Sequence, residues 1–156
     1  MIAEKGISEF IEAAFFINKI YPKTEFILAG DIDLGNPSGY AKEWINRKID
    51  NVIVKWLGHV EDVKNIMEET DVIVLPTYYK EGVPRSLIEA ASLELPIITT
   101  NIPGCSEIVN NNFNGLITSP KDVPALINAM MRRFMLSRPE IGFKVMANNK
   151  IVYDVP

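Results

Sequence analysis

Short apolar runs rich in Val, Ile and Leu alternate regularly with helical patterns along this chain of 156 residues. Strand-sized runs occur at 25–30, 52–57, 71–75, 96–99 and 115–118. Continuous apolar runs are typical of strands buried on both faces, and helices between such strands imply right-handed parallel crossovers. The pattern therefore predicts an α/β fold, a doubly wound and mostly parallel Rossmann-like sheet flanked by helices.

Helices are expected where apolar residues recur at three- and four-residue steps or where a capping residue precedes them. Ser38 is expected to cap the second helix. The first element is a helix, whereas a doubly wound domain normally opens with a strand, so a first strand is expected just before Met1. The predicted helices cover 8–20, 38–48, 61–68, 86–93, 105–109, 123–135 and 140–151.

The overall composition excludes several classes of protein. With 47% hydrophobic and 23% charged residues the chain is neither disordered nor collagen-like, and no apolar run approaches the length that spans a bilayer. A formal charge of -4 argues against nucleic acid as a partner. The single cysteine, Cys105, cannot form an internal disulfide and is expected to be a structural thiol in a cytoplasmic protein.

The segment from Pro76 to Ser86 runs from a strand end to a helix start. Ligands of open α/β sheets bind outside the carboxyl ends of the strands, and a helix N-terminus together with Lys80 and Arg85 suits a phosphate. Glu81 and Glu89 flank the helix terminus, where their carboxylates can accept hydrogen bonds from sugar hydroxyls. A structural interpretation is also open, because Ser86–Glu89 has the spacing of a capping box; Glu89 can fill both roles.

Longer motifs resemble the retaining glycosyltransferases of family 4, which are glycosyl transferases of group 1. The resemblance rests on 71–92, 95–100 and 103–109, and Glu81 and Glu89 match that family's E-x₇-E motif. It implies that residues 1–156 form one nucleotide-sugar-binding domain, the C-terminal domain of a GT-B fold. Shorter motifs extend the resemblance over nearly the whole chain, at Glu4–Gly6, Phe26–Gly30, Leu57–Val60 and Asn114–Ile117.

The resemblance implies a role for each matching residue. Glu81 is expected to bind hydroxyls of the donor sugar, Lys5 a phosphate and Glu89 the ribose. Alternatives stay open for Lys5 as a solvated surface side chain, for His59 as a polar loop residue and for Glu107 as a helix cap. The other expected donor-binding residues offer amides to the diphosphate or shape the base and sugar pockets: Gly82, Val83, Pro84, Arg85, Ser86, His59, Gly30, Gly104 and Glu107.

Two departures from the family pattern limit what this chain is expected to do alone. The family usually carries an Arg shortly before the Lys-Gly pair and a Gly-rich strand turn ahead of it, and this sequence has neither. The resemblance places the acceptor, a glycan or lipid-linked glycan, on an N-terminal domain absent from this chain. The chain alone is therefore expected to be inactive. The full enzyme is expected in the cytoplasm, with peripheral association at the inner face of the membrane.

The resemblance implies transfer of a sugar from a nucleoside diphosphate sugar to an acceptor hydroxyl with retention of configuration. Glu81–Pro84 replaces the commoner Glu-Gly-Phe-Gly, and this variant resembles enzymes of bacterial surface-polysaccharide assembly. No cofactor and no metal are expected, because Asp31 and Asp33 follow a strand whose family counterpart binds no metal.

Two other functions remain alternatives. A nucleotide-sugar epimerase of GT-B fold would turn over the donor without an acceptor. A non-catalytic nucleotide-binding module is the second alternative. A receiver-type signalling module needs an acidic residue at the end of a central strand, and Val74–Pro76 has none.

Overall fold

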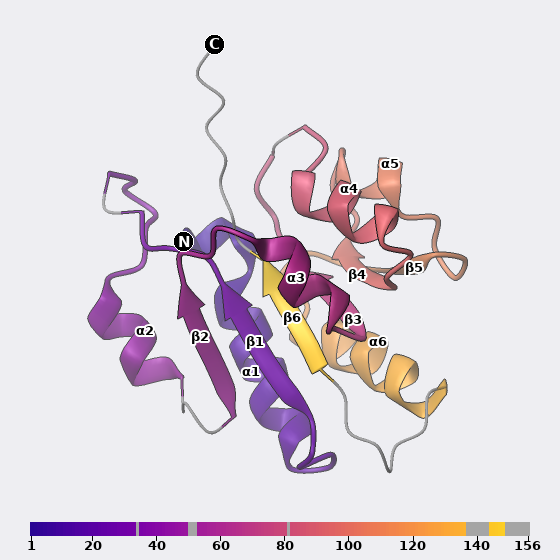
Figure 1. Cartoon of the computed structure of the whole chain (residues 1–156), viewed down its shortest axis with the longest axis horizontal. Coiled ribbons are helices and arrows are strands. Elements are labelled where there is room, and N and C mark those ends of the chain that lie inside the picture. Colours follow the sequence, from indigo (N-terminus) through magenta and orange to yellow (C-terminus); the bar gives the residue numbers. More distant parts are fainter. Residues whose placement is uncertain (34, 50–52, 81, 137–143, 149–156) are drawn as a thin grey trace.

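The computed structural model describes residues 1–33, 35–49, 53–80, 82–136 and 144–148, which form a three-layer α/β structure (Figure 1). Six strands make one parallel sheet in the order β2-β1-β6-β3-β4-β5. The predicted doubly wound α/β fold is confirmed. The strands are β1 (Glu25–Ala29), β2 (Val54–Gly58), β3 (Val72–Leu75), β4 (Ile97–Thr100), β5 (Gly115–Thr118) and β6 (Lys144–Asn148).

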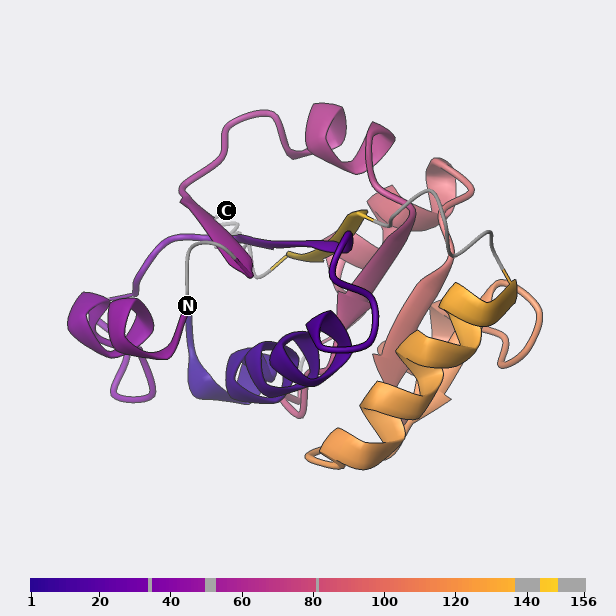
Figure 2. The same ribbon diagram turned by 90° about the horizontal axis from the view of Figure 1, so that it is seen from below.

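Helices cover both faces of this sheet, as the view from below shows (Figure 2). One face packs against α1, α2 and α6, and the other against α3, α4 and α5. The structure confirms the predicted positions of these helices to within a few residues, apart from the start of α2. The helices are η1 (Ala3–Lys5), α1 (Ile7–Asn18), α2 (Lys42–Lys48), α3 (Val63–Glu68), α4 (Arg85–Ser92), α5 (Cys105–Ile108) and α6 (Val123–Leu136).

The strands are apolar on both faces because each face has its own core. Along β6, Val145 and Ala147 belong to the cluster on the α1 and α6 side, whereas Met146 belongs to the cluster on the α3 and α4 side. All three side chains are at most 1% exposed. This alternation is the two-residue period of a strand covered by helices on both sides, and it accounts for the continuous apolar runs in the sequence.

The prediction of a helix over 140–151 is wrong for the residues that the structure describes. Residues 144–148 form β6, which pairs in parallel with β1 on one side and β3 on the other, and the remainder of the predicted helix lies outside the described residues. Lys, Met and Ala favour helices in isolation, but two neighbouring strands outweigh that weak local preference. In the doubly wound order 3-2-1-4-5-6, β6 occupies the position of the first strand. This is the position for which the sequence predicts a strand before Met1.

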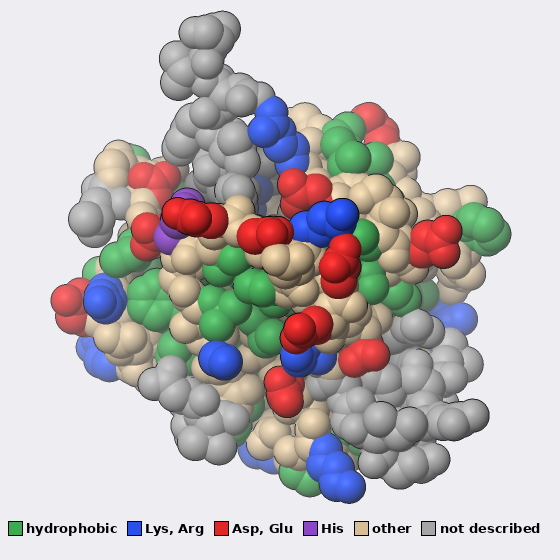
Figure 3. Space-filling model, viewed as in Figure 1, with side chains coloured by type: hydrophobic (Ala, Val, Ile, Leu, Met, Phe, Trp, Pro, Cys, Tyr) green, Lys and Arg blue, Asp and Glu red, His purple; other side chains and the backbone are tan. Residues whose placement is uncertain are grey.

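No helix in the described part of the chain is long and apolar enough to cross a membrane. On the face seen in Figure 3, acidic and basic side chains lie next to one another and do not gather into a patch of one sign. This distribution agrees with the small net charge of the sequence.

Candidate functional site

The carboxyl ends of the parallel strands bring the predicted site loops to one edge of the sheet. Gly30 follows β1 and His59 follows β2, and the Gly30 amide donates to the Gly58 carbonyl at 2.9 Å. The loop after β3 leads to α4, and the loop after β4 contains Gly104. Thr100 joins the last two loops, since its hydroxyl donates to the Thr77 carbonyl. The loops after β1 and β2 therefore adjoin each other, and so do the loops after β3 and β4.

Lys5 ends the short turn η1 and is only 4% exposed, so the alternative of a solvated surface side chain is wrong. Gly6 follows with a left-handed φ of 72°. The turn is bound to the loop after β3 through a single carbonyl, that of Glu4. This carbonyl accepts hydrogen bonds from the amides of Tyr78 (2.7 Å) and Tyr79 (3.1 Å) and from the hydroxyl of Thr77 (3.0 Å). Lys5 is thus fixed against the chain segment that leads to α4.

The side chain of Glu4 binds this turn to a second loop. Its Oε1 accepts a hydrogen bond of 2.7 Å from the hydroxyl of Ser38, in the loop between β1 and α2. The prediction that Ser38 caps α2 is therefore wrong, and Ala41 occupies the N-cap position instead. The Oε2 of Glu4 is buried and has no hydrogen-bond partner among the described residues. The carboxylate of Glu4 thus ties Ser38 to the turn that carries Lys5.

The start of α4 differs from the capping box that Ser86 and Glu89 were expected to form. Pro84 is the N-cap residue and forms no side-chain cap hydrogen bond, and Ser86 lies inside the first turn of the helix. The amides of Leu87 and Ile88 bond to the Pro84 carbonyl, so the helix begins one residue earlier than predicted. The first backbone N–H groups of a helix have no partner within the helix, and together with the positive end of the helix dipole they suit an anion.

The loop before α4 is exposed at Gly82 and Arg85, whereas Pro84 is buried and Val83 is partly buried. Ser86 is 9% exposed. Glu81, the predicted sugar ligand, lies outside the described residues.

Glu89 is exposed on α4 and lines a hollow of about 270 Å³. The opposite wall comes from the segment Glu61–Lys64, which follows His59 at the end of β2. His59 itself is exposed. The hollow therefore lies between the start of α3 and the second half of α4, which also contributes Ser92 and Leu93.

Gly104 and Glu107 lie together at the start of α5, beside α4. Gly104 is the N-cap residue with φ of 88°, and Glu107 is exposed in the first turn. Cys105 is 1% exposed, in agreement with the expectation of a structural thiol.

Two tyrosines that the sequence reasoning missed lie near the turn of Lys5. Burial raises the pKa of Tyr40 to about 12, with smaller contributions from Tyr78 and from the charges of Glu9 and Glu4. Burial also raises the pKa of Tyr78, again with contributions from Glu9 and Glu4. The only sequence signal for Tyr78 was its place beside a second tyrosine in the loop after β3.

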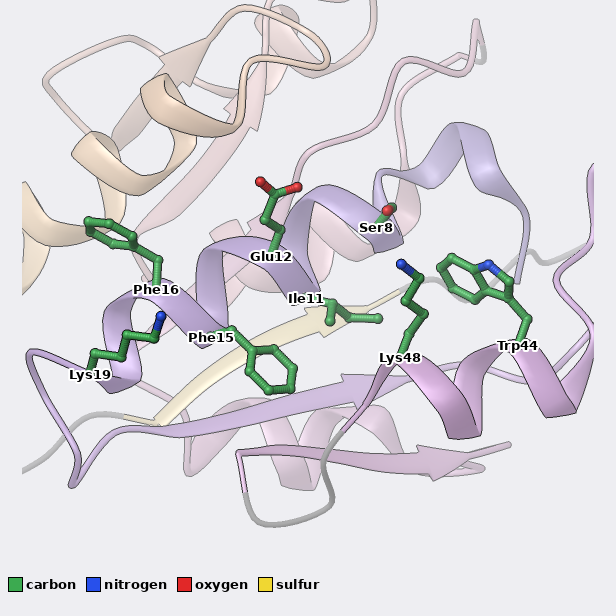
Figure 4. A pocket seen from close by; sticks show the side chains of 8 residues that line it. All are labelled: Ser8, Ile11, Glu12, Phe15, Phe16, Lys19, Trp44 and Lys48. Atoms are coloured by element: carbon green, nitrogen blue, oxygen red, sulfur yellow. The ribbon is translucent and has the colours of Figure 1, made fainter.

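No group of three or more His, Cys, Asp or Glu side chains that could hold a metal ion occurs among the described residues. A larger hollow of about 500 Å³ lies between α1 and α2, away from the predicted donor loops (Figure 4). Phe15 points into this hollow, and Trp44 and Lys48 border it from α2 (Figure 4).

Comparison with known proteins identifies the family. The sequence profile described as "Glycosyl transferases group 1" matches residues 1–134. The chain belongs to this family. It is 36% identical over 132 residues to the Escherichia coli UDP-Gal:alpha-D-GlcNAc-diphosphoundecaprenol alpha-1,3-galactosyltransferase, covering 83% of this chain and 33% of the relative.

A second relative from Campylobacter jejuni is the N,N'-diacetylbacillosaminyl-diphospho-undecaprenol alpha-1,3-N-acetylgalactosaminyltransferase. It is 34% identical over 122 residues, covering 78% of this glycosyltransferase chain and 30% of the relative. The chain thus spans about a third of the length of these relatives. Among solved structures, Anabaena HepE in complex with UDP has a TM-score of 0.75 and 25% identity, over 88% of this chain and 37% of that one.

Proposed function

We propose that this glycosyltransferase chain is the C-terminal, donor-binding part of a retaining GT-B enzyme and binds a nucleoside diphosphate sugar at the carboxyl edge of its sheet. One observation carries the proposal: a single loop, from β3 to α4, contacts the buried Lys5 and leads into the N-terminus of α4. Tyr79 makes the contact to Lys5, and Pro84 is the N-cap residue and forms no side-chain cap hydrogen bond. That combination places a cation beside the loop and backbone amides at its end, and a diphosphate requires both.

The two halves of the donor have different chemistry, and the site offers a place for each. The diphosphate takes the amides of Gly82–Ser86, the dipole of α4 and the ammonium group of Lys5. The nucleoside takes the hollow between Glu89 and the β2 loop, where the carboxylate accepts hydrogen bonds from the ribose. Glu81 is assigned to the donor sugar by its place in the E-x₇-E motif.

In the reaction, the bond between the anomeric carbon and the diphosphate oxygen breaks, and a bond to the acceptor oxygen forms on the same face of the sugar. Negative charge grows on the leaving diphosphate in the transition state. Lys5 and the amides at the start of α4 stabilise that charge, and because the fold holds them in place beforehand, they lower the barrier without reorganising. The acceptor hydroxyl passes its proton to the departing diphosphate oxygen, and the acceptor is bound by a partner domain outside this chain.

The comparisons support a uridine donor and a lipid-linked acceptor. The Escherichia coli relative is named for UDP-Gal, and both bacterial relatives are named for diphosphoundecaprenol acceptors. Structures similar in fold contain UDP and UDP-glucose. We therefore assign the whole enzyme to bacterial polysaccharide or glycolipid synthesis in the cytoplasm, at the inner face of the membrane.

Titration of the chain with UDP, GDP and uridine, followed by NMR, tests the proposal. UDP is expected to bind, and Lys5→Ala is expected to weaken UDP about tenfold, the loss of one hydrogen bond to a charged group. Lys23→Ala is the matched control, because Lys23 is exposed just before β1, at the opposite edge of the sheet. Absence of binding by both diphosphates, or sugar transfer by this chain alone, would contradict the proposal.

A further inference from the structure

Tyr79, in the loop after β3, contacts the side chain of Lys5. The Nζ of Lys5 lies 5.7 Å from the centroid of the Tyr79 ring, within the range of a cation–π interaction. The two residues differ in exposure, with Lys5 at 4% and Tyr79 at 42%. The tyrosine ring thus forms part of the border between the buried ammonium group and solvent.

The backbone fixes where this ring stands relative to Lys5. The Tyr79 amide donates to the carbonyl of Glu4, the residue before Lys5, at 3.1 Å. The same amide lies 3.1 Å from the hydroxyl of Thr77, which itself donates to the Glu4 carbonyl. Two short chain segments, 4–5 and 77–79, are therefore held in register by main-chain bonds. Side-chain substitution at Tyr79 removes the ring and leaves those bonds in place.

An aromatic face attracts the ammonium group and leaves its positive charge in place. The contact restricts the rotamers of a long flexible side chain, so less entropy is lost when an anion binds. Tyr79 is also only three residues before Gly82, where the amides proposed to bind the diphosphate begin. Its ring therefore contacts Lys5 from the same loop that leads to those amides.

We propose that Tyr79 is a positioning residue for diphosphate binding, acting through Lys5. The proposal deepens the assigned function and rests on it, since it requires Lys5 to bind a donor phosphate. The ring face and not the hydroxyl performs this role, because the cation–π contact requires only the aromatic face. Tyr79→Phe is therefore expected to preserve it and Tyr79→Leu to abolish it.

The neighbouring Tyr78 provides a matched control. Its ring makes a similar contact, 4.2 Å from the Nζ of Lys121 instead of Lys5. Tyr78→Leu removes a ring of the same size from the same loop and leaves the contact between Lys5 and Tyr79 intact. Circular dichroism of all three variants verifies that they fold.

Titrations with UDP and with uridine separate the diphosphate contribution from the nucleoside contribution. Tyr79→Leu is expected to weaken UDP about three- to tenfold, the range of a single cation–π contact, and to leave uridine unchanged. Tyr79→Phe and Tyr78→Leu are expected to bind UDP within about twofold of the original chain. Equal UDP affinity in Tyr79→Leu, or equal losses of UDP and uridine, would overturn the proposal while leaving the donor-binding function standing. Failure of the original chain to bind UDP would overturn both.

A second measurement needs no nucleotide. The ε-methylene signals of Lys5 in NMR spectra are expected to carry a ring-current shift that disappears in Tyr79→Leu and persists in Tyr79→Phe. Unchanged Lys5 signals in Tyr79→Leu would overturn the positioning role directly.

Discussion

Gly6 lies against Pro76 so closely that a Cβ atom on the glycine would be 2.2 Å from the Pro76 carbonyl oxygen. Gly6 has a φ of 72°, a backbone conformation that residues with a side chain rarely adopt. The close approach lets the turn with Lys5 lie directly on the end of β3. A glycine is thus required after Lys5 for a steric reason that is independent of any ligand.

Gly6→Ala is expected to lower the free energy of unfolding by at least about 2 kcal/mol, from left-handed strain and from overlap with a backbone atom that no rotamer can relieve. Urea unfolding measures the change. Gly35→Ala is the control, because its added Cβ would meet only the Asp33 side chain at 3.7 Å, and a change within about 0.5 kcal/mol is expected. Similar losses in both variants would mean that Gly6 is not constrained by Pro76.

The central strand β6 gives a second prediction. Met146 is 0% exposed between β1 and β3, and Met146→Ala is expected to destabilise the fold by about 2–5 kcal/mol through the cavity it leaves. Lys144→Ala changes the same strand at its partly exposed start, where the Nζ lies 3.2 Å from Glu69. Its cost is expected to stay below about 1 kcal/mol. Equally small effects of the two variants would show that this segment does not form the central strand.

The strand is also the clearest case of structure that the sequence could not predict. Val145–Ala147 is short, and Met and Ala carry no strand preference, so only its neighbours β1 and β3 identify it as a strand. The strands β1 to β5 were predictable because their apolar runs are bounded by turns and helices. The local sequence pattern was sufficient to predict β1 to β5. It was insufficient for β6, because the strands that surround β6 lie about 70 to 120 positions away in the sequence.

The residues of the candidate site also divide into those that the local sequence could predict and those that it could not. The loop that enters α4 was predictable, because a helix start after a strand end can be recognised from neighbouring residues. Ser38 and Tyr79 were not, since their partners Glu4 and Lys5 lie more than 30 and 70 positions away in the sequence. The capping box failed for a local reason: Pro84 has a fixed φ of −64° and serves as the N-cap, so Ser86 falls inside the helix.

A third prediction concerns the nucleoside half of the site. Glu89→Ala is expected to weaken uridine and UDP by a similar factor of about tenfold, since a hydrogen bond to a charged group contributes about 1.5–3 kcal/mol. NMR titration measures both affinities. The stability of the chain is expected to change little, because Glu89 is exposed and its side chain does not cap α4.

Glu68→Ala serves as the control for Glu89, because its carboxylate is half exposed on α3 and pairs with Lys64 in the same helix. It is expected to leave both affinities unchanged. A loss confined to UDP in Glu89→Ala would instead associate Glu89 with the phosphates.

A fourth prediction follows from the partly buried phenol of Tyr40. Burial favours the neutral form, so the pKa rises from 10.0 in the unfolded chain to about 12 in the folded protein. The contribution of Tyr40 to stability is therefore complete below pH 10 and is lost as the pH rises from 10 toward 12. Urea midpoints measured across this range are expected to fall, and absorbance near 295 nm follows the phenolate. Tyr40→Phe keeps the ring stacked on Trp44 at 3.8 Å and is expected to reduce the fall. An identical decline with and without the hydroxyl would mean that Tyr40 ionises as freely in the folded protein as in the unfolded chain.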